Sequence, residues 1–285
     1  MMKDINNNLS LNIIPPTANR KQKSIRGFLL CSLLLALYSF SSEDFKLINT
    51  IPFGHATLTT DRFGNAFVVV ENQLLEFDSL GKPKANYAES NTGRLTSVDA
   101  GNPLKILLFY KDFAQLQLLN NKLAKESTIE LRNMGILQPV VACQSTQDGY
   151  WVFDQQDFTL KKIDLNLRIV YQSDNMNQSL GYAVQPESII EANDFVYLNN
   201  PETGILVFDK FGSYYKTIPI PSVSSFQVIE KNLLYVKNNQ LRQFNFSTLD
   251  DHEIIIPAHD SLLSARFEQQ KLFLLTTGSL TFYSY

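Results

Sequence analysis

The sequence has few of the residues that form covalent or metal cross-links. It contains two cysteines and three histidines in 285 residues. Cys31 lies in an N-terminal apolar run, so removal of that run leaves Cys143 as a single thiol. We expect Cys143 to be buried as a small apolar residue, with an intermolecular disulfide as the alternative. The histidines lack the i, i+4 partner or nearby cysteine of a typical metal site, so we expect them on the surface or in loops: His55, His252 and His259.

Catalytic motifs and basic clusters are also scarce. The chain has no nucleophile elbow and no glycine-rich phosphate-binding loop. Ser145–Trp151 superficially resembles a sialidase Asp-box, but the order of its residues differs and it occurs once. We interpret it as a turn before a buried Trp151. The net charge is −3 and basic residues do not cluster after residue 26, which argues against a nucleic-acid partner.

What the chain does contain is a repeat. A Leu or Ile, two variable residues, a large apolar residue and then Asp, Asn or Ser recur six times. Steps of 36 to 45 residues separate the copies, a period typical of four-stranded propeller blades. We interpret the final Asp or Asn as a turn cap, with metal binding as the alternative. The copies are Leu74–Asp78, Leu116–Asn120, Leu160–Asp164, Ile205–Asp209, Leu241–Asn245 and Leu280–Ser284.

Short runs of β-branched and aromatic residues surround each copy and are separated by turn-forming residues. Four such runs per repeat predict four antiparallel strands, of which the pattern is the third. Residues 43–285 are therefore expected to form an all-β, six-bladed β-propeller with roughly 40 residues per blade. Among single strands, we expect Leu95–Val98 to begin blade two and Glu253–Pro257 to end blade five.

Blade six has only three strands before the chain ends, and we expect the fourth from the other end of the domain. Phe45–Pro52 fits none of the four positions of blade one. Its Thr50-Ile51-Pro52 matches Thr217-Ile218-Pro219 in the fourth strand of blade four. The pattern predicts that Phe45–Pro52 pairs antiparallel with Leu280–Tyr283 and closes the ring.

Residues 1–42 do not belong to the repeat. A polar, Asn-rich stretch is followed by basic residues between Arg20 and Arg26 and by the apolar run Gly27–Phe40. That run is short for a membrane span but suits a signal peptide, with cleavage before Ser42. We expect export to the periplasm or cell envelope, with no membrane span in the mature form. An uncleaved N-terminal anchor is the alternative.

Two motifs resemble a known propeller family. Asp61-Arg62-Phe63-Gly64-Asn65 and Phe77-Asp78-Ser79-Leu80-Gly81 in blade one resemble the NHL repeat, and Phe208–Gly212 repeats the second half in blade four. The whole chain looks like small exported propellers of Bacteroidota envelopes, some of them accessory to type IX secretion. NHL-type propellers are mostly binding platforms, so the resemblance implies binding and no particular chemistry.

Five first strands end in an acid. Because such turns surround the central channel on one face, these acids could form a negative ring for a divalent cation or a cationic partner. The alternative is that they cap their turns, which we favour. The five acids are Asp61, Asp99, Glu191, Glu230 and Glu268, and Asp148 follows slightly later in blade three.

The opposite face carries connections of unequal length, the longest being Ser173–Pro186. Unequal loops on a regular scaffold are where repeat proteins place recognition. Phe113 and Phe158 could contribute to such a recognition surface, or they could pack against neighbouring blades. The candidate partner-binding residues are Asp112, Phe113, Asp157, Phe158, Tyr182, Asn199 and Asn200.

These features predict a non-catalytic, exported module that binds or scaffolds envelope proteins without a cofactor. The alternative is a metal-dependent propeller hydrolase or lactonase with a cation in the channel. The first strands offer mostly neutral groups, which have little acid–base capacity. Those groups are Thr59, Ser97, Cys143, Ser188, Gln227 and Arg266.

Overall fold

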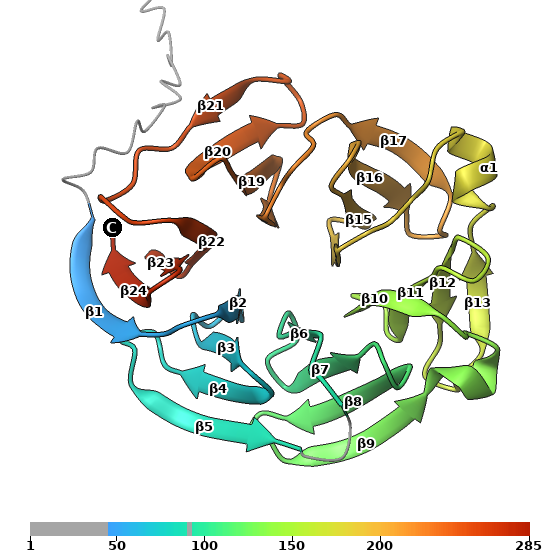
Figure 1. Cartoon of the computed structure of the whole chain (residues 1–285), viewed down its shortest axis with the longest axis horizontal. Coiled ribbons are helices and arrows are strands. Elements are labelled where there is room, and N and C mark those ends of the chain that lie inside the picture. The colour runs from blue at the N-terminus through green and yellow to red at the C-terminus, as the bar shows by residue number, and fades with distance from the viewer. Residues whose placement is uncertain (1–44, 90–92) are drawn as a thin grey trace, which may run out of the picture. The chain divides into compact units, whose positions relative to one another are not determined.

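The computed structural model describes residues 45–89 and 93–285, so our predictions for residues 1–42 lie outside the described part. The described chain forms six four-stranded antiparallel sheets around a common axis (Figure 1). The predicted six-bladed β-propeller is therefore confirmed. In each blade the first strand lies at the axis and the fourth at the rim.

The strands follow the repeat in chain order. Blades one to three are β2 (Ala56–Thr60), β3 (Ala66–Val70), β4 (Gln73–Phe77), β5 (Pro83–Ala88); β6 (Ser97–Asp99), β7 (Lys105–Tyr110), β8 (Gln115–Asn120), β9 (Lys125–Glu130); and β10 (Pro139–Gln144), β11 (Tyr150–Asp154), β12 (Thr159–Ile163), β13 (Ile169–Gln172). Blades four to six are β14 (Ser188–Ala192), β15 (Phe195–Asn200), β16 (Gly204–Asp209), β17 (Tyr214–Ile218); β18 (Ser225–Ile229), β19 (Asn232–Lys237), β20 (Gln240–Asn245), β21 (Asp251–Glu253); and β22 (Leu262–Glu268), β23 (Lys271–Thr276), β24 (Ser279–Ser284), β1 (Lys46–Pro52).

The recurring five-residue pattern lies on the third strand of every blade. Its first residue is at most 1% exposed in all six copies, because it fills the space between neighbouring sheets. Its final Asp or Asn caps the turn into the fourth strand in the first five copies. In blade one, for example, the backbone N–H groups of Leu80 and Lys82 both donate to Oδ1 of Asp78 at 2.9 Å. The turn-cap interpretation of these residues is confirmed.

Hydrophobic clusters lie between neighbouring blades, so the core follows the ring. Between blades three and four, Trp151 and Phe208 are fully buried in one cluster. Cys143 belongs to the same cluster and is a free thiol at 1% exposure. Burial of Cys143 and Trp151, both expected from the sequence, is confirmed.

The ring closes as predicted. β1 pairs antiparallel with β24, and Thr50 faces Thr281 in the register. Phe45, just before β1, is buried and contacts the ring of Tyr285 with centroids 5.7 Å apart. The first segment of the described chain therefore completes the last blade.

Two strand predictions were wrong at their boundaries. In blade two the inner strand is Ser97–Asp99. Leu95 still belongs to the loop before it, because its backbone N–H donates to Oδ1 of Asn72 in blade one at 2.6 Å. In blade five the outer strand is Asp251–Glu253. In the run that follows it, the side chains of Ile254 and Ile256 pack against the cluster between blades five and six.

The connection Ser173–Pro186 was expected to be irregular and instead contains a short helix, α1 (Met176–Leu180). Asn175 caps it by accepting the backbone N–H of Gln178 at 3.0 Å. Met176 and Val184 are buried, so the connection is anchored to the junction of blades three and four. No helix within residues 45–89 and 93–285 is long and apolar enough to cross a membrane.

Candidate functional site

Four of the acids at the first-strand turns each accept hydrogen bonds from a different set of backbone or side-chain donors. Asp61 is buried and accepts N–H groups of its own turn, from Phe63 at 2.9 Å and Asn65 at 2.8 Å. Asp99 in blade two accepts the backbone N–H of Gly101 at 2.8 Å and that of Gln144 in blade three at 2.7 Å. Burial raises the pKa of the Asp99 carboxyl, and these two hydrogen bonds oppose the rise.

Two of the glutamates connect neighbouring blades. Oε2 of Glu191 in blade four accepts the indole N–H of Trp151 at 2.9 Å, and Oε1 accepts the hydroxyl of Thr146 at 2.9 Å. Oε1 of Glu268 in blade six accepts the hydroxyl of Thr60 at 3.2 Å and the amide of Gln227 at 2.8 Å. These carboxylates act as inter-blade hydrogen-bond acceptors.

Glu230 and Asp148 are exposed. Among the described residues, no three His, Cys, Asp or Glu side chains are grouped so that they could hold a metal ion.

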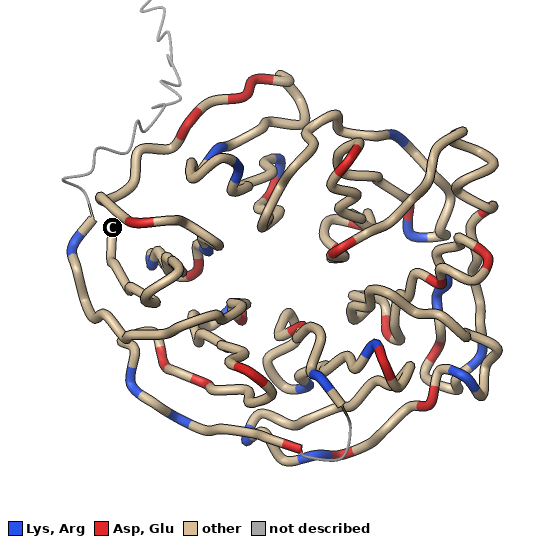
Figure 2. Tube along the Cα trace, in the orientation of Figure 1, with Lys and Arg blue, Asp and Glu red and all other residues tan. Residues whose placement is uncertain are grey.

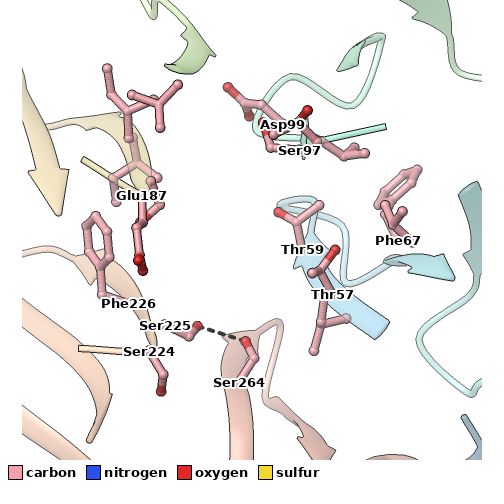
Figure 3. A pocket seen from close by; sticks show the side chains of 18 of the residues that line it. Thr57, Thr59, Phe67, Ser97, Asp99, Glu187, Ser224, Ser225, Phe226 and Ser264 are labelled. Carbon is pink, nitrogen blue, oxygen red and sulfur yellow. Dashed lines mark hydrogen bonds between the residues drawn. The ribbon is translucent and has the colours of Figure 1, made fainter. Parts of the chain in front are cut away.

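A cavity lies at the axis and is lined by residues of the inner strands of all six blades. Figure 3 shows part of this lining. The volume of the cavity is about 430 Å³. Serine and threonine hydroxyls and aliphatic side chains line most of it, and Ser225 and Ser264 are hydrogen-bonded at 2.8 Å (Figure 3). Of the six first-strand groups singled out from the sequence, four line the cavity: Thr59, Ser97, Ser188 and Arg266. Cys143 lies in a hydrophobic cluster, and Gln227 is bonded to Glu268 between blades five and six.

Three charged side chains line this cavity. Asp99 and the exposed Glu187 are acidic, and Figure 3 shows both. Arg266 is the basic one, and its Nη1 donates to the backbone oxygen of Phe226 in blade five at 2.6 Å. Nε of Arg266 is buried without a hydrogen-bond partner. Burial lowers the pKa of Arg266 to about 10.

The candidate partner-binding residues of the loop face differ in their exposure and in their contacts. Asp112 is exposed, and Phe113 is 44% exposed but packs closely over Gly93. Asp157 pairs with Lys161 at 2.7 Å. Phe158 and Tyr182 pack against the core cluster of blades three and four, which is the second interpretation offered for Phe158.

Asn199 and Asn200 are buried. Nδ2 of Asn199 donates to the backbone oxygen of Val223 at 3.0 Å, and Oδ1 of Asn200 accepts the N–H of Gln185 at 2.8 Å. These two amides hold the connecting loops and present no group to a partner in solution.

An exposed apolar surface at the rim of blades three and four was missed in the sequence. Ile169, Val170 and Tyr171 are all 37–42% exposed on β13, an outer strand that pairs only with β12. The ring of Tyr171 contacts that of Phe211 in blade four, with centroids 5.4 Å apart. We use the name rim patch for the exposed apolar residues of the outer strands of blades three and four and of the turns that precede them: Leu165, Leu167, Ile169, Val170, Tyr171, Phe211, Tyr214 and Tyr215.

The sequence did contain a signal for the rim patch. Ile169–Gln172 carries no charge and no proline, whereas the outer strands β5 and β9 contain lysine, glutamate or proline. Charge and proline are the usual protection of an exposed strand edge.

Comparisons with known proteins agree on the fold. No model of a known protein family matches the sequence, and no curated protein does. The WD40 domain of Neurospora crassa Pan2 is 8% identical, with a TM-score of 0.63 over 86% of this chain and 97% of that one. Virginiamycin B lyase from Staphylococcus aureus is 12% identical, with a TM-score of 0.59 over 85% and 99% of the two chains. BBS1N, solved in complex with ARL6DN, is 15% identical, with a TM-score of 0.52 over 80% and 76%.

At these identities the similarity establishes a β-propeller and nothing further about activity.

Proposed function

We propose that this chain is a non-catalytic propeller of the cell envelope that binds a protein partner through the rim patch. The observation that carries the proposal is the exposure of eight large apolar side chains on the outer strands of two neighbouring blades and in the turns that precede them. Exposed apolar patches of this kind mark interaction sites, because leaving them in water is unfavourable. The free edge of β13 could also accept an extended segment of the partner through backbone hydrogen bonds.

The composition of the central cavity supports the proposal that the protein is not an enzyme. Hydroxyl and aliphatic groups dominate its lining, and no histidine belongs to it. The fold by itself is compatible with either class, since a lyase and a propeller in a protein complex are both structurally similar. Lys and Arg are spread around the described ring among Asp and Glu (Figure 2), which favours a protein partner over a nucleic acid.

The experiment is site-specific photo-crosslinking in the cells that produce the protein. A photoreactive residue at Val170 or Tyr215 should yield a defined crosslinked species, whereas the same residue at Leu104 should not. Leu104 is a matched control because it is 61% exposed, as Tyr215 is, but belongs to blade two. The crosslinked protein, once identified and purified, should bind the wild-type chain and lose at least tenfold in affinity for Val170→Glu. Equal crosslinking from all three positions would contradict the proposal.

The envelope location is proposed from the basic residues Arg20–Arg26 and the apolar run Gly27–Phe40. Fractionation with N-terminal sequencing tests it. We expect a mature chain that begins near Ser42. A soluble cytoplasmic product that retains Met1 or Met2 would refute export.

A further inference from the structure

We infer that the central cavity binds a small monocarboxylate, or a chain end carrying one, and that Arg266 pairs with the carboxylate. This site lies at the axis and is separate from the rim patch, so either can fail without the other. The inference goes beyond protein binding and assigns a ligand class to the cavity.

The first argument is the incomplete pairing of Arg266. A guanidinium has five N–H donors, and the structure gives Arg266 one hydrogen bond, from Nη1 to the oxygen of Phe226. Its Nε is buried and unpartnered, and none of the ion pairs in the described chain includes Arg266. Burial lowers the pKa of Arg266 to about 10 in spite of the attraction of Glu268 and Asp99, so the cost of desolvating this cation is only partly offset. An anion that entered the cavity would relieve this cost through the bidentate geometry that arginine favours.

The neighbouring acids Glu268 and Asp99 attract Arg266 but form no ion pair with it, and they restrict the charge of the ligand. Both oxygens of Asp99 already accept backbone N–H groups. Glu268 on the same strand accepts from Thr60 and Gln227, and Glu187 is exposed. None of these carboxylates lies within ion-pair distance of the guanidinium. Their negative field disfavours a ligand with several negative charges, so a single carboxylate fits better than a phosphate.

The rest of the lining describes the body of the ligand. Hydroxyls of Thr57, Thr59 and Ser97 lie along the wall together with the apolar Phe67 and Phe226 (Figure 3). A volume of about 430 Å³ is within the range of small-molecule sites. A carboxylate attached to a short, neutral and partly apolar group therefore matches the cavity.

The test compares acids with their uncharged amides on the full chain by isothermal titration calorimetry and ligand-observed NMR. Isobutyrate and N-acetylvaline represent a free small acid, and N-acetyl-Ser-Ala-Val represents a peptide C-terminus. We expect at least one acid to bind at least tenfold more tightly than its amide. Tight binding of the tripeptide alone assigns the site to a chain end, and binding of the small acids assigns it to a metabolite-sized ligand. If no acid is preferred over its amide, the inference is wrong.

Variants then assign the preference to Arg266. Arg266→Met should remove the acid-over-amide preference while keeping the cooperative unfolding transition, because it replaces an unpaired buried charge with an apolar side chain of similar length. Arg266→Lys, which keeps the charge but loses the fork, should weaken the preference without abolishing it. Arg242→Met is the control, since Arg242 pairs with Asp251 on blade five and lies outside the cavity lining. An acid preference that survives in Arg266→Met would overturn the inference.

Discussion

The hydroxyl of Thr60 in blade one donates a hydrogen bond of 3.2 Å to Oε1 of Glu268 in blade six, where the ring closes. Gln227 in blade five donates to the same oxygen at 2.8 Å. One carboxyl therefore connects three blades. Burial raises the pKa of Glu268 to about 7, against the weaker opposing effects of Thr60 and Arg266.

We expect the contribution of Glu268 to stability to fall as the pH rises from about 4.5 to about 7. The unfolded chain loses this proton near pH 4.5, whereas the folded chain retains it up to about pH 7. The folded state binds more protons within that window, so the free energy of unfolding decreases as pH rises. Glu268→Gln, which is neutral at every pH, should match wild type near pH 4 and be more stable at pH 8.

Urea unfolding of both proteins at several pH values measures this difference. Glu187→Gln serves as the control, because Glu187 is exposed at the cavity, and its curve should run parallel to that of wild type. A constant difference between Glu268→Gln and wild type from pH 4 to pH 8 would show that Glu268 titrates normally.

A second contact between blades is the hydrogen bond from the indole N–H of Trp151 in blade three to Glu191 in blade four. Replacing Glu191 by Ala leaves the buried indole N–H and the Thr146 hydroxyl without their acceptor. We expect the free energy of unfolding to fall by about 1–3 kcal/mol. Glu191→Gln keeps an oxygen acceptor and should lose less. Glu230→Ala, an exposed acid at the equivalent turn of blade five, should change stability by less than about 0.5 kcal/mol. Equal losses in the two Ala variants, measured by urea unfolding, would refute this role of Glu191.

The pairing of β1 with β24 can be trapped covalently. The hydroxyl oxygens of Thr50 and Thr281 are 3.4 Å apart on facing residues, so cysteines at both positions should form a disulfide under mild oxidation. The background carries Cys31→Ala and Cys143→Ala. The disulfide should raise the free energy of unfolding by about 2–4 kcal/mol, because it restrains a very long loop in the unfolded chain.

The control for this crosslink places cysteines at Thr50 and Thr128, the second on β9 in blade two. Non-reducing gel electrophoresis and mass spectrometry report the bond. A crosslink in the control pair with none between positions 50 and 281 would mean that the ring closes differently.

Gly149 is expected to tolerate no side chain. Its φ is 85°, and a Cβ at this position would lie 2.0 Å from the backbone oxygen of Ile163 in the neighbouring strand. Gly149→Ala should therefore lower the free energy of unfolding by about 3 kcal/mol or more. Gly181 has a similar φ of 75° with nothing near its Cβ position, so Gly181→Ala isolates the backbone strain at about 1 kcal/mol. Thermal and urea unfolding measure the stability of both variants. Equal decreases in the free energy of unfolding would disprove the steric argument.

The site was less predictable than the fold. Cys143, Trp151 and the turn caps were assigned correctly because each depends on neighbouring residues in its own repeat. Asn199 and Asn200 were assigned to a partner surface because they belong to one of the unequal loops on the face where repeat proteins place recognition. The structure buries them, since their hydrogen-bond partners come from loops 15 to 24 residues away. Ile169–Tyr171 was not among the candidate residues, although its lack of charge already distinguished it from β5 and β9.

The sequence by itself determined the number of blades, the strand order within each blade and the closing strand. Those properties rest on one buried Leu or Ile per repeat and on short-range alternation, which any blade must satisfy on its own. Only the tertiary structure decided which groups meet across blades: Trp151 with Glu191, Tyr171 with Phe211, and Arg266 with the backbone oxygen of Phe226. Such contacts depend on the tilt and spacing of neighbouring sheets, which follow from packing the whole ring and are not encoded in any local pattern.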